Sequence, residues 1–120
     1  MKPDDLLPLQ EPTFYILLSL AEGEKHGYAI LKDVAELSGG RLQLGTGTLY
    51  GALSRLLEQR LIQRAANGAH PPEGGPDELS GRAVKAYALT HGGRQVLQAE
   101  TGRLECLLAA ARLRLGQEGA

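Results

Sequence analysis

The chain has 120 residues, of which 42% are hydrophobic and 22% charged, a composition typical of one small globular domain and not of a disordered or disulfide-rich protein. Its longest apolar run is too short to span a bilayer, its first residues do not resemble a signal peptide, and its single cysteine excludes an intrachain disulfide. We therefore expect a cytoplasmic protein without membrane contact. The chain offers no grouping of residues typical of an enzyme, a metal site or a cofactor site.

The net charge of -1 conceals an uneven distribution of charge. Lys and Arg outnumber Asp and Glu by 4 to 1 in residues 41–64 and by 6 to 3 in residues 82–120, whereas acidic residues predominate elsewhere. Salt screens charges that lie more than about 8 to 10 Å apart, so one basic face is enough to meet phosphates. The near-neutral total therefore does not argue against a nucleic-acid partner.

Three segments with helical periodicity come first in the chain. The first runs from Glu11-Pro12 to Gly23 and is apolar on most sides, which predicts a core helix that also contributes to a dimer contact; a buried strand is the alternative. The second runs from about Tyr28 to Ser38 and ends at Gly39-Gly40. The third runs from about Gly47 to Gln59 and carries its leucines on one narrow face.

The opposite face of the third segment is small, hydroxylated or basic. It carries Thr48, Tyr50, Gly51, Ser54 and Arg55. Such side chains let a helix approach a duplex closely while they hydrogen-bond to phosphates and base edges. An ordinary solvated helix face is the alternative. Tyr50 is expected to contact a phosphate, with packing against the preceding helix as the alternative, and Arg55 to clamp a phosphate in preference to reading a guanine.

Extended character follows at residues 61–64 and returns at residues 84–89. The intervening residues 67–81 are rich in Gly and Pro, which cannot hold regular structure, so they predict a flexible tip between two strands. A hairpin directly after a helix-turn-helix is a wing. We therefore predict a mainly α fold with a small β-hairpin, in which residues 1–90 form a winged helix-turn-helix domain with its wing at about 61–89. The tip is acidic and would be repelled by phosphates, so only the base of the wing is expected to contact DNA.

The last segment, residues 91–116, predicts one long helix with Thr90 as its N-cap and Gly116 at its end. At 1.5 Å per residue the helix would be roughly 34 Å long, too long for one small domain to cover. Its apolar residues have a heptad-like spacing, which favours a second copy as partner over packing wholly within the domain. Cys106 is expected to be buried and not to act as a redox switch. The expected dimer contact comprises Phe14, Leu97, Leu104, Leu108, Ala111 and Leu115.

Several short motifs occur in a characteristic order. They are His26-Gly27-Tyr28-Ala29-Ile30-Leu31, Gly47-Thr48-Leu49-Tyr50-Gly51-Ala52-Leu53-Ser54-Arg55-Leu56, Leu61-Ile62, Gly81-Arg82, Lys85, and Tyr87-Ala88-Leu89-Thr90 followed by Gly93-Arg94. Each motif is weak by itself. Together they cover about residues 7 to 100, and the chain resembles the PadR family of transcriptional regulators, of the short kind with a single C-terminal helix.

The resemblance implies a homodimer that binds double-stranded DNA at a pseudo-palindromic operator and represses transcription, with release by a small-molecule effector in several relatives. Its half-sites would be roughly one helical turn apart or a small multiple of it. Gly45 stands where relatives often have a capping serine, so either Thr46 caps the helix or the helix starts loosely. The residues expected to contact DNA are Thr46, Thr48, Tyr50, Gly51, Ser54, Arg55, Arg82 and Lys85. The alternative function is a winged-helix module that binds a protein and has no affinity for DNA.

Overall fold

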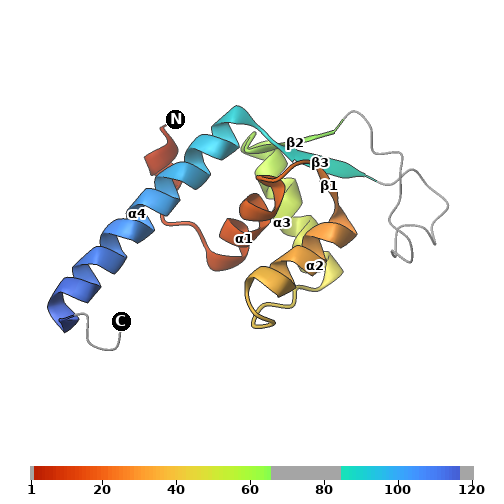
Figure 1. Ribbon diagram of the computed structural model, residues 1–120. Coiled ribbons are helices and arrows are strands. Elements are labelled where there is room, and N and C mark those ends of the chain that lie inside the picture. Colours follow the sequence, from red (N-terminus) through yellow and green to blue (C-terminus); the bar gives the residue numbers. More distant parts are fainter. Residues whose placement is uncertain (1, 66–84, 117–120) are drawn as a thin grey trace.

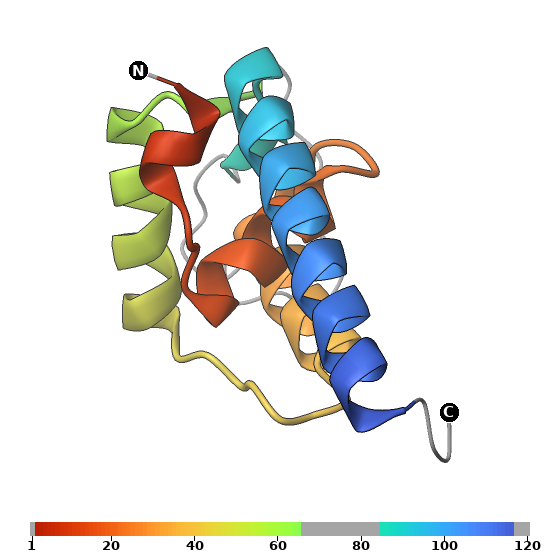
Figure 2. The same cartoon turned by 90° about the vertical axis from the view of Figure 1, so that its left-hand side faces the viewer.

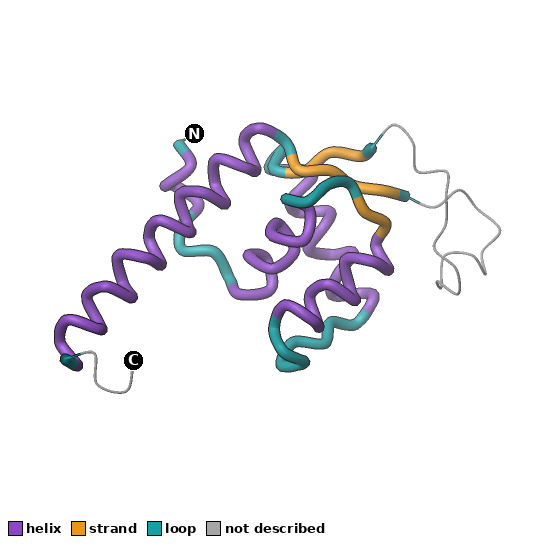
Figure 3. Tube along the Cα trace, viewed as in Figure 1, coloured by secondary structure: helices purple, strands orange, loops and turns teal. Residues whose placement is uncertain are grey.

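Four α-helices and three short strands make up the described part of the chain, residues 2–65 and 85–116 of a computed structural model. The elements are η1 (Pro3–Leu6), α1 (Glu11–Leu20), β1 (Lys25–His26), α2 (Gly27–Leu37), α3 (Thr46–Glu58), β2 (Ile62–Arg64), β3 (Ala86–Leu89) and α4 (His91–Leu115). Figures 1 and 3 show α1, α2 and α3 gathered together, the strands along one side of them, and α4 running away from them. The predicted fold class is confirmed. The predicted wing tip, residues 67–81, and Arg82 lie outside the described residues.

The helices begin and end close to the residues that the sequence predicts. α2 begins one residue earlier than expected, and Gly39 and Gly40 follow its end with φ angles of 67° and 84°, which favour glycine. The N-cap position of α3 is Gly45, which has no side chain with which to cap. Thr46 is already inside the helix and is not its N-cap, so no side chain caps the start of α3.

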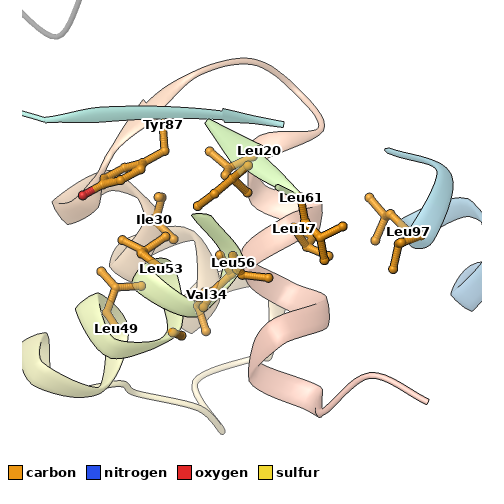
Figure 4. Packing of buried hydrophobic residues seen from close by; sticks show 14 residues of the cluster. Leu17, Leu20, Ile30, Val34, Leu49, Leu53, Leu56, Leu61, Tyr87 and Leu97 are labelled. Carbon is orange, nitrogen blue, oxygen red and sulfur yellow. The ribbon is translucent and has the colours of Figure 1, made fainter. Parts of the chain in front are cut away.

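The core lies between α1, α2, α3 and the start of α4 (Figure 4). Ile16 and Leu17 of α1 are fully shielded from solvent, which confirms α1 as a core helix, and burial of each such side chain contributes about 1.5 to 3 kcal/mol. Tyr87 is also buried in this core. Leu97 of α4 is only 6% exposed and points toward Leu17 and Leu61. The prediction that Leu97 is a dimer contact therefore needs correction, because its own domain already covers it.

The sheet is antiparallel and has the strand order β1-β3-β2. β2 and β3 pair with Ile62 opposite Leu89 and Arg64 opposite Tyr87, so the two arms of the predicted hairpin are present. β1 pairs with the other edge of β3, with Lys25 opposite Tyr87. β1 was not predicted because two residues are too few to show a strand's alternation. β1 lies in the segment between α1 and α2, so its pairing with β3 attaches this segment to the base of the wing.

Lys25 anchors β1 to the first two helices. Its Nζ donates a hydrogen bond to the Ser19 carbonyl oxygen (2.9 Å) and forms an ion pair with Asp33, while the Ser19 hydroxyl donates to Asp33 Oδ2 (2.8 Å). Partial burial disfavours the charge on both groups, but their hydrogen bonds outweigh it. The pKa of Lys25 is therefore raised and the pKa of Asp33 is lowered. Both groups stay charged at neutral pH, and β1 is held in register with β3.

Four elements meet at one place in the fold: the end of α3, the strands β2 and β3 of the wing, and the start of α4. We call this place the α3–α4 junction, and it comprises Arg60, Leu61, Thr90 and Gly93. The Thr90 hydroxyl donates to the Arg60 carbonyl oxygen (2.7 Å), and the Thr90 amide donates to the Leu61 carbonyl oxygen (3.1 Å). The same hydroxyl accepts from the Gly93 amide (2.9 Å), which confirms the predicted N-cap. A β-carbon at Gly93 would overlap the Leu61 carbonyl oxygen, so only glycine permits this approach. The junction fixes the direction of α4 relative to α3.

Glu100 holds the amino-terminal segment against α4. Its carboxylate is 2% exposed and accepts hydrogen bonds from the Leu9 amide (3.1 Å) and from Arg103 (2.5 and 2.9 Å). The hydrogen bonds from Arg103 lower the pKa of Glu100 in spite of its burial. Figure 2 shows η1 between the end of α3 and the first half of α4. The amino-terminal segment is therefore part of the packed domain.

Tyr50 of α3 lies over the first residue of α2. Gly27 is buried, and a β-carbon at this position would overlap the Tyr50 hydroxyl. The Tyr50 ring is half-buried against the core. The separation of α2 and α3 therefore depends on the missing side chain at residue 27, and Tyr50 has the packing contact that the sequence offered as the alternative.

We expect Gly93→Ala to lower the free energy of unfolding by about 3 kcal/mol or more, because the new methyl group meets a backbone carbonyl that cannot move aside. Gly102→Ala is the matched control on the same helix. A β-carbon at Gly102 has no neighbour within 4 Å among the described residues, so we expect a gain of about 0.5 to 1 kcal/mol from helix propensity. Chemical denaturation measures both, and equal effects would contradict the close approach at the junction.

We expect Gly27→Ala to lower the free energy of unfolding by about 1 to 3 kcal/mol, because the Tyr50 ring must leave its place. In a Tyr50→Leu background the same change should cost almost nothing, since the overlapping atoms are gone. A double-mutant cycle measured by urea denaturation isolates this coupling. Additive effects of the two substitutions would show that Tyr50 does not set the position of α2.

Candidate nucleic-acid interface

The exposed side of α3 is a strip of small residues. Each residue turns the helix by about 100°, so Gly47, Gly51 and Ser54 share one side of α3, opposite the buried leucines. A β-carbon at Gly47 would meet no described atom within 4 Å, so the surface here consists of backbone. A strip of this kind lets a flat partner, such as the edge of a base pair, approach the helix closely. Gly47 was not among the predicted contacts, although its spacing of four residues from Gly51 was a usable signal.

Polar side chains flank the α3 strip. Thr48 and Arg55 lie on one flank, and the half-buried Tyr50 lies on the other. Arg55 is exposed, and its Nη1 atom lies 3.8 Å from where a β-carbon at Gly51 would be, so its side chain runs back along α3. Within the described residues Arg55 forms no ion pair. Its guanidinium donors are therefore available to an external anion.

The amino-terminal end of α3 offers further hydrogen-bond donors. Gly45, Thr46, Gly47 and Thr48 are all exposed. The amides of a first helical turn have no partner within the helix and carry partial positive charge. Together with the hydroxyls of Thr46 and Thr48, they can donate to a phosphate. Glu58 is exposed at the opposite end of the strip and would repel a phosphate, so the chemistry favours anions near the first turns.

Two cations lie on neighbouring strands at the base of the wing. Arg64 ends β2 and Lys85 directly precedes β3, and both side chains are exposed. The backbone pairing places Arg64 opposite Tyr87, two residues from Lys85. Arg64 was not among the predicted contacts, although it is one of the four basic residues in the basic segment 41–64. The predicted contact Arg82 lies outside the described residues.

The predicted dimer residues, apart from Leu97, lie at or near the surface of α1 and α4. Phe14 is half-buried and stands edge-on to Tyr15, with ring centroids 6.0 Å apart. Leu108 and Leu115 are 50% and 74% exposed, and Leu104 and Ala111 are exposed as well. Leu107, which was not predicted, is 54% exposed. The expectation that Cys106 is buried is wrong for the single chain, because this part of α4 has no neighbouring element to cover it.

The described residues contain no helix with the length and apolarity that a bilayer crossing needs. Their His, Cys, Asp and Glu side chains form no group of three or more that could hold a metal ion.

Comparison with known proteins identifies this arrangement. Over 85 residues, 71% of this chain, the sequence is 39% identical to an uncharacterized 37.1 kDa protein of a Streptomyces fradiae transposon, and the match spans only 20% of that relative's length. A PadR family transcription regulator from Clostridium difficile has a similar structure, with a TM-score of 0.67 and 25% identity over 88% of this chain and 99% of that chain.

A second solved structure shares the fold at lower identity. Bacillus subtilis PadR in complex with operator DNA matches with a TM-score of 0.58 and 23% identity, over 75% of this chain and 46% of that chain. The family model described as "Transcriptional regulator PadR-like family" matches residues 16–99. This range includes the helices and strands described above, except for η1, the start of α1 and the part of α4 after residue 99. The chain therefore belongs to the PadR-like family of transcriptional regulators.

Proposed function

We propose that this chain is a sequence-specific DNA-binding regulator that represses transcription as a homodimer on a pseudo-palindromic operator. The observation that carries the proposal is the exposed strip on α3, with its free arginine and uncapped first turn. An ordinary solvated helix face would carry more Glu and Lys than this strip does. The similar fold of a PadR that was captured with operator DNA supports the same proposal.

The chemistry of the strip suggests how the subunit meets a duplex. The amino-terminal turns of α3 enter the major groove, where Gly47 and Gly51 allow close approach and Ser54 reaches base edges. Thr46 and Thr48 donate to phosphates beside the groove, and Arg55 clamps a phosphate. Lys85 and the undescribed Arg82, together with Arg64, meet the backbone from the wing. Tyr50 contributes by holding α3 against α2, and its own contact with DNA stays a prediction.

An apolar stripe on the second half of α4 supports the homodimer. In the first half of the helix, Val96 and Leu97 are buried by the domain itself. The same side of the helix continues beyond the domain, where no described residue covers it (Figure 1). Its members are Leu104, Leu107, Leu108, Ala111 and Leu115. A second copy related by a two-fold axis would cover this α4 stripe and present two α3 helices to one duplex.

Release by a small-molecule effector stays a prediction from the family resemblance. Phe14 and Tyr15 could line a modest apolar site between two subunits, as the sequence suggests. The competing function is a winged-helix module that binds a protein. The near-neutral charge favours that reading, whereas the unpaired Arg55 and the backbone surface of the α3 strip favour DNA.

We expect Arg55→Ala to weaken binding to the promoter of the protein's own gene by about 1 to 3 kcal/mol, or roughly 5- to 150-fold, and to reduce the salt dependence of binding. Glu58→Ala on the same helix is the control, and removal of this acid should leave affinity equal or slightly higher. Fluorescence anisotropy over a series of salt concentrations measures both. Wild-type protein that shows no sequence preference at any salt concentration would contradict the proposal and favour the protein-binding alternative.

We expect Leu108→Glu to raise the dimer dissociation constant at least about tenfold, because a carboxylate would be buried in the middle of the α4 stripe. Ala109→Glu places the same charge on the neighbouring residue, which is exposed and faces away from the stripe, and it should leave dimerisation unchanged. Sedimentation velocity at several concentrations measures both. A monomeric wild-type protein, or equal effects of the two variants, would contradict the proposed dimer contact.

A further inference from the structure

A groove of about 540 Å³ runs between α1 and α2, on a part of the domain that the α3 strip and the wing do not use. Its apolar lining is Leu18, Ala21 and Leu37, and its acidic lining is Glu22, Asp33 and Glu36. Leu37 is strongly exposed for a leucine at the end of an amphipathic helix. We call this feature the α1–α2 groove. Its chemistry fits a partner segment that is both apolar and basic.

The acids of the α1–α2 groove are unequally neutralised. Asp33 is paired with Lys25 and accepts from Ser19, and Glu22 has an exposed contact with the same lysine. Glu36 forms no ion pair within the described residues. One lysine thus serves two of the acids, and the groove keeps a negative surplus that an external cation can balance.

The carboxyl-terminal end of α4 has the complementary chemistry. Arg112 and Arg114 are its basic last-turn residues, both exposed and without an ion pair in the described chain. Leu113 and Leu115 beside them are the most exposed large apolar side chains of the described residues. This α4 end is far from the groove of its own subunit, because α4 runs away from α1 and α2 (Figure 1). The carboxyl-terminal end of α4 can therefore reach an α1–α2 groove only in another copy of the chain.

The α4 stripe and the α1–α2 groove are connected on the molecular surface. Arg94, in the first turn of α4, donates from Nη2 to the carbonyl oxygen of Ala21, which lines the groove (3.4 Å). If two α4 helices cross antiparallel near Leu104, the first residue of the uncovered stripe, the last turn of one helix lies level with residues 94–96 of the other. A partner helix laid along the stripe therefore leads to the groove.

We propose that the last turn of α4 of the partner subunit docks in the α1–α2 groove, with Arg112 of the partner subunit facing Glu36. Arg114 of the partner subunit adds to the charge balance near Glu22, and Leu115 of the partner subunit packs on Leu18 and Leu37. The proposal rests on the proposed homodimer and adds a second, reciprocal contact to the α4 stripe. It ties each helix-turn-helix to the other subunit, and so sets the separation of the two α3 helices.

Charge reversal with subunit mixing tests the proposal. Subunit one carries Glu36→Arg, and subunit two carries Arg112→Glu. Each variant alone should have a dimer dissociation constant about 3- to 30-fold above wild type, since like charges meet in both grooves. Mixing the two restores opposite charges in both grooves of a heterodimer, so heterodimers should exceed the statistical half. High salt should reduce these differences. Glu58→Arg, the same reversal on α3, should leave dimerisation unchanged.

Native mass spectrometry of differently labelled subunits gives the heterodimer fraction, and circular dichroism reports whether each variant folds. If a reversal variant fails to fold, Glu36→Gln and Arg112→Gln should still weaken the dimer in the same direction. Suppose that the wild-type protein dimerises and binds DNA, that the variants dimerise as well as wild type does, and that the mixture gives the statistical fraction of heterodimers. This result would overturn the groove contact and leave the proposed function standing, with the groove empty or taken by another partner. A monomeric wild-type protein would overturn both.

Discussion

The arrangement of this protein depends on the close approach of two backbone segments at the α3–α4 junction. Gly93 lies so near the Leu61 carbonyl that no side chain fits, and Thr90 links the end of α3 to the first turn of α4 through its hydroxyl. The helix with the candidate DNA surface, the strands of the wing and the helix with the α4 stripe all leave from this place. A change of angle here would move the candidate DNA surface on α3 relative to the α4 stripe. In the proposed homodimer, the junction would therefore set the spacing of the two α3 helices.

The sequence predicts most of the fold because the relevant signals are local. Helical periodicity, the Thr90 cap and Gly116 fix the ends of α4 to within a residue, and the heptad-like spacing identifies its uncovered side. Signals that require tertiary contact were missed. β1 exists because Lys25 lies opposite Tyr87, which is far along the chain, and Leu97 is buried because α1 happens to cover the first half of α4. The spacing of apolar residues predicts which side of a helix is covered, but it does not predict whether the same chain or a second copy covers it.

The candidate site was predictable to a similar degree and for the same reason. The polar side of α3 follows from the positions of its leucines, and the exposed Thr48, Ser54 and Arg55 agree with it. The contact between Tyr50 and Gly27 could not be derived this way, because it depends on the distance between two helices. A tyrosine hydroxyl suits both a phosphate and a buried contact, so residue type alone does not separate these roles.

The net charge does not predict the local charge at the candidate DNA surface, because some charged side chains are held in ion pairs and others are not. Lys25, Arg41 and Arg103 are held in ion pairs with Asp33, Glu11 and Glu100, which removes both members of each pair from long-range electrostatics. Among the described residues of α3 and the wing base, Arg55, Arg64 and Lys85 are exposed and belong to no such pair, and Glu58 is the acid that faces the same way. Exposed cations without an ion pair therefore outnumber exposed acids on this described surface, although the total charge is -1. The same separation of charge leaves Glu36 in the α1–α2 groove and Arg112 at the end of α4 without an ion pair among the described residues. In the homodimer that we propose, each of these residues would meet the other across the two subunits.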